Sequence, residues 1–302
     1  MAGAGGVALC GPLDVEDLLA LISTDPVPAV DLKRSVQAAL ASPAFDGGDT
    51  PVENSVGAFY GSRTVIKLQH REHETLQTVH RFERLRELAG IRAPRLLDSG
   101  TVDTQSGEIW WSVLERLPGG ACLRPTPEQQ RALGAELRRW HSLGSPGGLR
   151  LDDPGALGVL LGSSRKAMPR AYPALAELFA EACAGLPMTA IHGDLAVGHN
   201  ALFDGDTLTG VLDPGAVDTG PSVLDLAWAL AVDLPHGGAV EPFIEGYGPD
   251  GVDRAALDAV LPLMMIRRLI DTPYLETGEA DARWLVEWLR PRRPDLLNLI
   301  GI

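Results

Sequence analysis

The residue pattern of this chain changes at one place, the segment LPGGACLRPTP at residues 117–127. Its paired glycines and three prolines are residues that interrupt regular secondary structure. Before it, short runs rich in β-branched and aromatic residues predict strands; after it, apolar residues recur mostly at helical spacing. A strand-rich part followed by a helical part predicts an α+β fold. We place the first domain at residues 1–117 and the second at residues 118–302.

The first domain is predicted to hold a small sheet and several helices. The runs GAFY and RTVIKL, separated by Gly61 and Ser62, indicate a β-hairpin. Two further strands are expected in PRLLDSG and EIWWSVLERL, joined by the polar loop TVDTQSGE. Helical spacing and capping residues predict helices at residues 14–23, 31–41 and 72–89.

The second domain is predicted to be helical except around one polar loop. Helices are expected at residues 127–142, 171–185, 221–234, 251–270 and 279–290. Between the second and the third of these, residues 188–214 hold short apolar runs around a loop that carries His, Asp, Gly and Asn. Because polar side chains gather there beside apolar segments, we expect the functional site at this loop.

The overall charge excludes some classes of partner. The chain has 26 basic and 40 acidic residues and a formal charge of −14, which argues against binding to nucleic acid or to an anionic membrane. No apolar run reaches the roughly 18 residues of a membrane span. The first basic residue is Lys33, so no secretory signal is expected, and three widely spaced cysteines predict free thiols. We therefore expect a cytoplasmic protein.

One lysine lies inside an apolar run. The sequence has only three lysines, and Lys67 is flanked by Val65, Ile66 and Leu68. It could lie on an edge strand, with its aliphatic stem against the sheet. It could instead be a cation directed into a cleft, where it holds phosphate oxygens and is oriented by a helix glutamate.

Two acidic motifs follow in the second domain. The segment IHGDLAVGHN places Asp194 after His-Gly at the end of a short strand, where a carboxylate can accept a proton from a substrate hydroxyl. The segment GVLDPG places Asp213 at the end of an apolar run, and its oxygens suit Mg²⁺. Each motif alone also fits an ordinary turn.

These motifs follow one another along the chain as a lysine in a strand, a hinge, an aspartate loop and a second aspartate. Phosphoryl transfer to an alcohol needs the same parts in the same order. With VLERLPGG, LGAELRRWHSL and GPSVLDLAWAL, these motifs resemble the aminoglycoside phosphotransferase family of small-molecule kinases. The resemblance runs nearly end to end. It implies a two-lobed protein-kinase-like fold, with a small antiparallel-sheet N-lobe and a larger, mostly helical C-lobe. It also implies Mg²⁺ with ATP or GTP as the phosphate donor.

The resemblance implies roles for residues of the polar loop. Asp194 would be the catalytic aspartate and Asp213 a metal ligand. His192 and Asp225 would support the loop, although an acid near a helix start, such as Asp225, can also be an ordinary cap.

The resemblance also implies a nucleotide site in the first domain. Lys67 would contact the α- and β-phosphates and would be paired with Glu83 or, as the alternative, with Glu74. The remaining implied residues are Ser55 in the nucleotide loop, Leu114 as gatekeeper, and Glu115 and Leu117, whose main chain would bind the purine.

The loop departs from the common family pattern at the second metal ligand. Most members have Asn five residues after the catalytic aspartate, whereas here His199 is fifth and Asn200 is sixth. Counting forward makes His199 the ligand, as in the macrolide phosphotransferase branch, whose loop reads Gly-His. Counting back from ALFD makes Asn200 the ligand. Ligand hardness favours Asn200, but spacing favours His199, which we take as the first prediction.

The implied function is an antibiotic O-phosphotransferase that confers resistance. It would move the γ-phosphate of ATP or GTP to a hydroxyl of a macrolide, a capuramycin-type nucleoside or an aminoglycoside. The alternatives are a kinase of a primary metabolite, such as an amino alcohol or a sugar, and a catalytically silent kinase-like binding module. Partners other than nucleotide and acceptor are not expected, and the chain is expected to be a monomer or a weak dimer.

Overall fold

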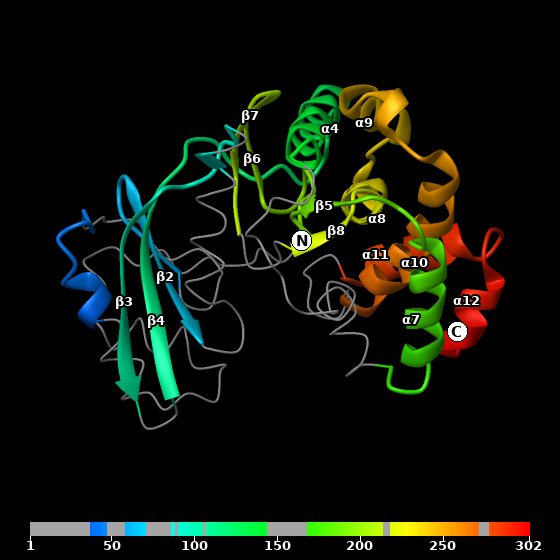
Figure 1. The fold of residues 1–302 in the computed structure, drawn as a ribbon, viewed down its shortest axis with the longest axis horizontal. Helices are drawn as coiled ribbons and strands as arrows, with labels where there is room; N and C mark the ends of the chain where they lie inside the picture. Colours follow the sequence, from blue (N-terminus) through cyan, green and yellow to red (C-terminus); the bar gives the residue numbers. More distant parts are fainter. Residues whose placement is uncertain are drawn as a thin grey trace, which may run out of the picture. The chain divides into compact units, whose positions relative to one another are not determined.

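The computed structural model describes residues 37–46, 58–70, 86–87, 90–104, 107–143, 168–213, 218–271 and 278–302. The chain divides into two compact units, residues 1–83 with 93–117 and residues 84–92 with 118–302. The first unit contains a sheet and the second is mostly helical, which confirms the predicted α+β class (Figure 1). None of the helices in the described part of the chain has the length and apolar character of a membrane span.

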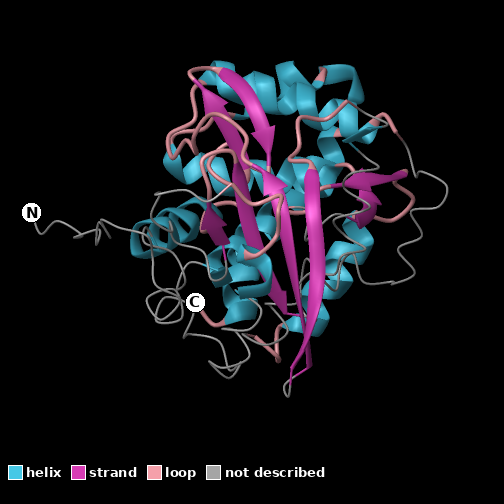
Figure 2. Ribbon diagram, turned by 90° about the vertical axis from the view of Figure 1, so that its left-hand side faces the viewer, coloured by secondary structure: helices cyan, strands magenta, loops and turns pink. Residues whose placement is uncertain are grey.

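The first unit contains a four-stranded antiparallel sheet of order β1-β2-β4-β3. Figure 2 draws its strands among the magenta arrows. Its strands are β1 (Ala58–Tyr60), β2 (Thr64–His70), β3 (Leu96–Thr104) and β4 (Gly107–Glu115). The predicted hairpin of β1 and β2 is confirmed. The segment TVDT, expected to begin a loop, instead extends β3, because Asp103 pairs with Glu108 and Thr104 with Gly107.

The segment before β1 is fixed to the β1–β2 turn by Asp46. Its carboxylate accepts hydrogen bonds from the Ser62 hydroxyl at 2.5 Å, the Arg63 amide at 2.7 Å and the Thr64 hydroxyl at 2.5 Å. The two side-chain hydrogen bonds hold the pKa of Asp46 well below its usual range.

Three predicted helices of the first domain fall largely outside the described residues. Nothing of 14–23 is described. Of 31–41, residues 37–41 are described and 37–40 are helical. Of 72–89, only residues 86–87 are described, and both are helical.

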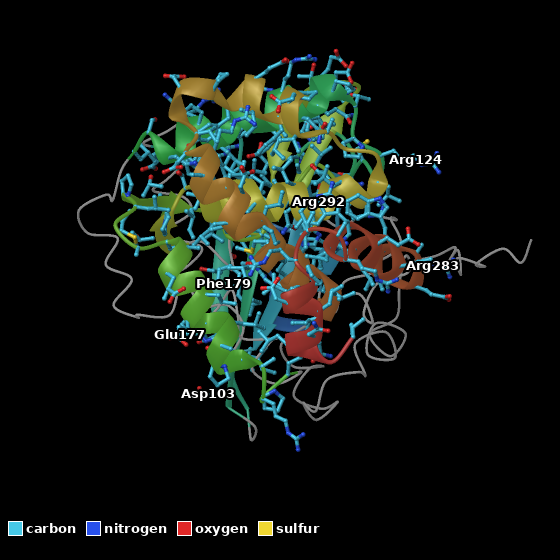
Figure 3. The ribbon with its side chains drawn as sticks, turned by 90° about the vertical axis from the view of Figure 1, so that its right-hand side faces the viewer. Asp103, Arg124, Glu177, Phe179, Arg283 and Arg292 are labelled. Carbon is cyan, nitrogen blue, oxygen red and sulfur yellow. The ribbon has the colours of Figure 1, made fainter. Side chains whose placement is uncertain are left out.

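The second unit is built around α8 (Val223–Asp233), in which every residue is buried. Helix α10 (Arg254–Asp271) packs against α8, and also against α7 (Tyr172–Ala182) and α11 (Gly278–Leu289). On α7, Phe179 is buried and Glu177 is exposed (Figure 3). A helix that is buried around its whole circumference is surrounded by other elements on every side. Helix α8 therefore gives rigid support to the segments that contact its two ends.

A second helix pair consists of α4 (Pro127–His141) and α9 (Val240–Tyr247). Helix α4 begins with a capping box, in which the Thr126 hydroxyl accepts from the Gln129 amide and the Gln129 side chain accepts from the Thr126 amide. The predicted helices agree with α4, α7, α8, α10 and α11 to within a few residues. Helix α9 and the C-terminal α12 (Pro294–Ile300) were not predicted.

Two short ladders frame the polar loop of the second unit. Strand β5 (Met188–Ile191) pairs with β8 (Asp218–Pro221), and β6 (Ala201–Asp204) pairs with β7 (Thr207–Val211). Asp194 therefore follows the end of β5 and Asp213 follows the end of β7.

The second unit includes residues 84–92, of which 86–87 and 90–92 are described. The carbonyl oxygen of Arg92 accepts a hydrogen bond of 2.7 Å from the Val211 amide, and its guanidinium donates to the Leu208 carbonyl at 2.5 Å. These contacts attach Arg92 to two residues of β7, Leu208 and Val211.

Candidate active site

The loop after β5 is attached to the first turn of α8 by Asp225. Its carboxylate is fully buried and accepts hydrogen bonds from the main-chain amides of His192 at 2.8 Å and Gly193 at 2.7 Å. The ring of His141 on α4 lies 3.0 Å from the same carboxylate, and its other nitrogen lies 2.9 Å from the Tyr247 hydroxyl. A buried carboxylate with these donors is satisfied and holds the loop in place.

His192 connects the two acidic motifs. Its Nε2 donates to the Leu212 carbonyl at 2.8 Å, and its Nδ1 accepts from the Asp194 amide at 3.3 Å. This pattern places the ring proton on Nε2. The ring is fully buried beside Trp140, so it fixes the segment before Asp213 against the segment before Asp194.

Asp194 lies beside both candidates for the second metal ligand. The His199 Nε2 is 3.1 Å from Asp194 Oδ2, and the Asn200 side-chain amide donates to the same oxygen at 3.2 Å and to the Asp194 carbonyl at 2.9 Å. Among the described residues, both side-chain contacts are made to Oδ2. The Asp194 side chain is 29% exposed.

The charges of this cluster favour an ionised Asp194. Burial opposes ionisation, but the hydrogen bond and charge of His199, with the charge of Arg267, outweigh it and lower the pKa of Asp194. For His199, burial again opposes the charged form, while Asp194 and then Asp213 raise its pKa above the usual value. His199 is therefore a hydrogen-bond donor to Asp194 in this arrangement.

Asp213 is placed beside the loop by its neighbour Leu212. The Leu212 amide donates to the Asn200 carbonyl at 2.7 Å, and the Leu212 carbonyl accepts the His192 hydrogen bond described above. Asp213 and Asn200 are the two described non-glycine residues with positive φ, at 53° and 62°. Non-glycine residues held in this conformation cost about 1–3 kcal/mol each and cluster at functional sites.

The donor set of this cluster suits Mg²⁺. That ion takes hard oxygen ligands and is usually bound by one or two carboxylates together with waters and substrate phosphates. The Asp213 carboxylate and the Asn200 amide supply hard oxygen atoms of this kind. Within the described ranges, no group of three or more His, Cys, Asp or Glu is placed to hold a metal ion by itself.

Sequence reasoning missed two residues that support the loop, His141 and Asp233. Asp233, the last residue of α8, is 1% exposed and accepts hydrogen bonds from the amides of Val197 at 3.2 Å and Gly198 at 3.0 Å. The sequence signal for Asp233 was a single acid at the end of the apolar run LAWALAVD. The signal for His141 was a histidine directly after a tryptophan in the predicted helix 127–142.

Lys67 occupies the middle of β2 in the first unit. It pairs with Ala58 of β1 and Ser112 of β4, so β2 has a neighbour on each side. The edge-strand interpretation is therefore wrong. Its neighbour Ile66 is fully buried on the opposite face, whereas the Lys67 side chain is half-buried.

The other predicted nucleotide residues lie at the end of β4 or outside the described residues. Leu114 pairs with Val65, and the Glu115 amide donates to the Arg95 carbonyl at 2.9 Å. The Glu115 carboxylate pairs with the Arg95 guanidinium at 3.0 Å. Leu117 follows β4 and is half-buried. Ser55, Glu74 and Glu83 lie outside the described residues.

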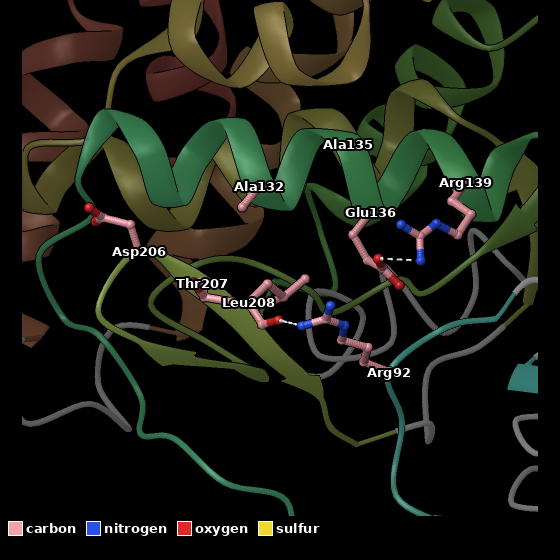
Figure 4. Close-up of a pocket in the computed structure, with 8 residues that line it drawn as sticks. All are labelled: Arg92, Ala132, Ala135, Glu136, Arg139, Asp206, Thr207 and Leu208. Atoms are coloured by element: carbon pink, nitrogen blue, oxygen red, sulfur yellow. Dashed lines mark hydrogen bonds and ion pairs between the residues drawn. The ribbon is translucent and has the colours of Figure 1, made fainter.

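A separate cavity of about 210 Å³ lies between α4 and the β6–β7 hairpin (Figure 4). Its walls include Glu136, Arg92 and Arg139, and they do not include the residues of the polar loop. Glu136 is 3% exposed, and burial raises its pKa even though both arginines oppose this.

Comparison with known proteins identifies the family. The sequence profile of the phosphotransferase enzyme family matches residues 54–260. An aminoglycoside 3'-phosphotransferase of Streptomyces ribosidificus is 32% identical over 190 residues, which cover 55% of this chain and 70% of that protein. Both matches agree with the resemblance inferred from the motifs.

Solved structures show the same fold. The structure of an aminoglycoside-3'-phosphotransferase of type VIII has a TM-score of 0.56 and 20% identity, over 78% of this chain and 97% of that one. A choline/ethanolamine kinase family protein from Mesorhizobium loti has a TM-score of 0.53 and 17% identity, over 89% of this chain and 98% of that one. These likenesses confirm the two-lobed kinase-like fold, and the profile match shows that the chain belongs to the phosphotransferase enzyme family of small-molecule kinases.

Proposed function

We propose that this protein transfers the γ-phosphoryl group of ATP or GTP to a hydroxyl of a small-molecule antibiotic, with Asp194 as the catalytic aspartate. The observation that carries the proposal is the Asp194 carboxylate itself. Its Oδ2 accepts from His199 and Asn200, its pKa is lowered, and its side chain remains partly exposed. An ionised, oriented and accessible carboxylate can hold a substrate hydroxyl for in-line attack and accept its proton.

The nucleotide is assigned to two sets of residues. Lys67, a cation on an interior strand, is proposed to hold phosphate oxygens, with Glu83 or Glu74 as its acidic partner and Ser55 in the loop before it. The purine is proposed to meet the main chain of Glu115 and Leu117 beside Leu114. Because the Glu115 amide already donates to Arg95, the Glu115 carbonyl and the Leu117 main chain are the groups that remain for this contact.

Mg²⁺ is proposed to be held by Asp213 and Asn200. Bound with the nucleotide, it would neutralise the charge that develops on the transferred phosphoryl group. The contacts of Asn200 support it over His199. Its amide nitrogen faces two acceptors of Asp194, so its oxygen points the other way and remains a ligand. His199 instead directs Nε2 to Asp194 and is proposed to orient that carboxylate.

Replacing Asn200 by Gly is expected to lower the transfer rate about 100-fold and to raise the Mg²⁺ concentration required. Glycine accepts the positive φ of this position, so the variant removes the side chain without straining the main chain. His199→Ala is expected to cost about tenfold, since the ring acts only through Asp194. Titration of the rate with Mg²⁺ separates the two. A larger Mg²⁺ dependence in His199→Ala than in Asn200→Gly would restore His199 as the ligand.

Aminoglycosides are proposed as the first acceptor class to test. The chain is 32% identical to an aminoglycoside 3'-phosphotransferase over 190 residues. Its formal charge of −14 also favours cationic acceptors in the encounter, because oppositely charged partners associate faster. Macrolides and capuramycin-type nucleosides remain the next classes, the first of them because the loop contains Gly-His.

The test is a transfer assay with purified protein, Mg²⁺ and either ATP or GTP. The panel contains kanamycin, streptomycin, a macrolide, a capuramycin-type nucleoside and choline, and mass spectrometry detects the gain of one phosphate. We expect transfer to at least one antibiotic, and none by Asp194→Asn. Phosphorylation of choline alone would favour a metabolite kinase. Tight nucleotide binding with no transfer to any acceptor would favour a silent binding module.

A further inference from the structure

Helix α8 contacts the polar loop at both of its ends. Near its start, Asp225 holds the amides of His192 and Gly193. At its end, Asp233 holds the amides of Val197 and Gly198, one on each carboxylate oxygen. Because α8 is buried along its whole length, its two acids fix two points of the loop at a constant separation.

The position of Asp233 is costly for a carboxylate. It is 1% exposed, and it lies at the C-terminal end of a helix, where the helix dipole repels negative charge. Burial raises its pKa to about 7, although the Gly198 and Val197 amides, Arg268 of α10 and His199 all act in the opposite direction. A group that lowers stability in this way is commonly kept because function needs it.

The two amides that Asp233 binds belong to the tip of a turn. The turn is closed by hydrogen bonds between Ala196 and His199, with N···O distances of 2.8 and 3.1 Å. Val197 and Gly198 are its two central residues, and their successive amides converge on one anion. The residues that leave the turn are His199 and Asn200, which are the two that contact Asp194.

We propose that Asp233 is a positioning residue for phosphoryl transfer, which holds the tip of the 196–199 turn so that Asn200 and His199 stay in contact with Asp194. It acts through the turn rather than on substrate or metal. This inference rests on the proposed catalytic role of Asp194. Aspartate is required because each oxygen accepts one amide, whereas an asparagine would present an N–H group to one of the two N–H donors.

A matched control is available in Asp281. It is also buried, at 3% exposure, and it pairs with Arg268 and His236 at 3.4 Å each. It shares Arg268 with the surroundings of Asp233, and its ion pairs with Arg268 and His236 join α11 to α10 and to residues 234–236. A general effect of replacing a buried acid by its amide should therefore appear in Asp281→Asn as well as in Asp233→Asn.

The experiment compares both variants with the wild-type full chain at pH 8. We expect Asp233→Asn to lower kcat at least tenfold, with the nucleotide KM nearly unchanged. Hydrogen exchange at the amides of Val197 and Gly198 should become at least tenfold faster, since one of them loses its acceptor. Asp281→Asn should change neither quantity.

Thermal unfolding separates positioning from simple structural support. Because the pKa of Asp233 is raised by folding, ionising this group costs stability as pH rises from about 4 to about 7. Asparagine does not ionise, so at pH 8 Asp233→Asn should unfold at the same temperature as wild type or a higher one, while its kcat is lower. At pH 5, which is closer to the ordinary pKa of an aspartate, that difference in unfolding temperature should be smaller.

Three outcomes would overturn the inference. They are a wild-type kcat in Asp233→Asn, unchanged exchange at Val197 and Gly198, or equal losses of kcat in Asp233→Asn and Asp281→Asn that follow a lower unfolding temperature. The exchange measurement needs no substrate, so it is independent of the proposed function. If the wild-type chain transferred phosphate to no antibiotic, the proposed function would fail, while faster exchange in Asp233→Asn would still show that Asp233 holds the turn.

Discussion

Asp194→Asn is expected to lower the rate of phosphoryl transfer by about 10²–10⁴-fold, with nucleotide affinity nearly unchanged. The amide has the size of the carboxylate, so the contacts with His199 and Asn200 can largely persist. What is lost is the negative charge and the ability to take a proton from the acceptor hydroxyl. Those contributions belong to the transition state, so kcat should fall and the nucleotide Kd should not.

The measurement is steady-state kinetics with Mg²⁺ and nucleotide, combined with calorimetric titration of the nucleotide. Asp204→Asn is the matched control, because Asp204 is an exposed carboxylate at the end of β6 and lies outside the candidate site. It should retain wild-type turnover. Turnover of Asp194→Asn within tenfold of wild type would remove Asp194 from the catalytic role.

Asp213→Asn is expected to lower activity by roughly 100-fold or more, because loss of a ligand charge removes several kcal/mol of electrostatic stabilisation from the metal site. Asparagine tolerates the positive φ of this position. The substitution therefore tests the charge and not the backbone, which an alanine would strain. The fold should be intact, since Asp213 follows a strand end and its side chain is half-buried.

The readout that isolates this effect is the rate measured against Mg²⁺ concentration, with far-ultraviolet circular dichroism as the check on folding. Excess Mg²⁺ should recover part of the activity of Asp213→Asn and none of that of Asp194→Asn. Wild-type Mg²⁺ dependence in a folded Asp213→Asn protein would contradict the metal assignment.

The sequence alone determined the class of fold and the order of the motifs. Short β-type runs, helical periodicity and the break at 117–127 are local patterns, and local patterns decide most of whether a segment becomes a helix or a strand. The same holds for Asp194 and Asp213, since each follows an apolar run that becomes a strand, β5 or β7. The resemblance to a phosphotransferase family also came from contiguous residues.

The sequence did not determine how distant segments pair. Strand β5 pairs with β8, which lies 27 residues or more further along the chain. Strand β3 continues through a stretch that was expected to be a polar loop, because residues of β4 lie opposite it and pair with it. Residues 84–92 likewise belong to the second unit, although the chain on both sides of them, 1–83 and 93–117, belongs to the first. The register of a strand and the choice of its partner strand depend on contacts between residues that are distant in the sequence. The local alternation of polar and apolar residues does not specify those contacts.

Only the tertiary structure decided which polar residues share a site. Asp225 and Asp233 are both acids in an apolar helix pattern, and the sequence marked one and missed the other. The structure shows each of them bonded to two amides of the same loop. The structure likewise gives the contacts of the two candidate metal ligands: the Nε2 of His199 lies beside the Asp194 carboxylate, and the side-chain amide of Asn200 donates to the Asp194 carbonyl. The physical reason is that the cost of burying a polar group, and its pKa, are set by the donors that the fold brings to it and not by its neighbours in the chain.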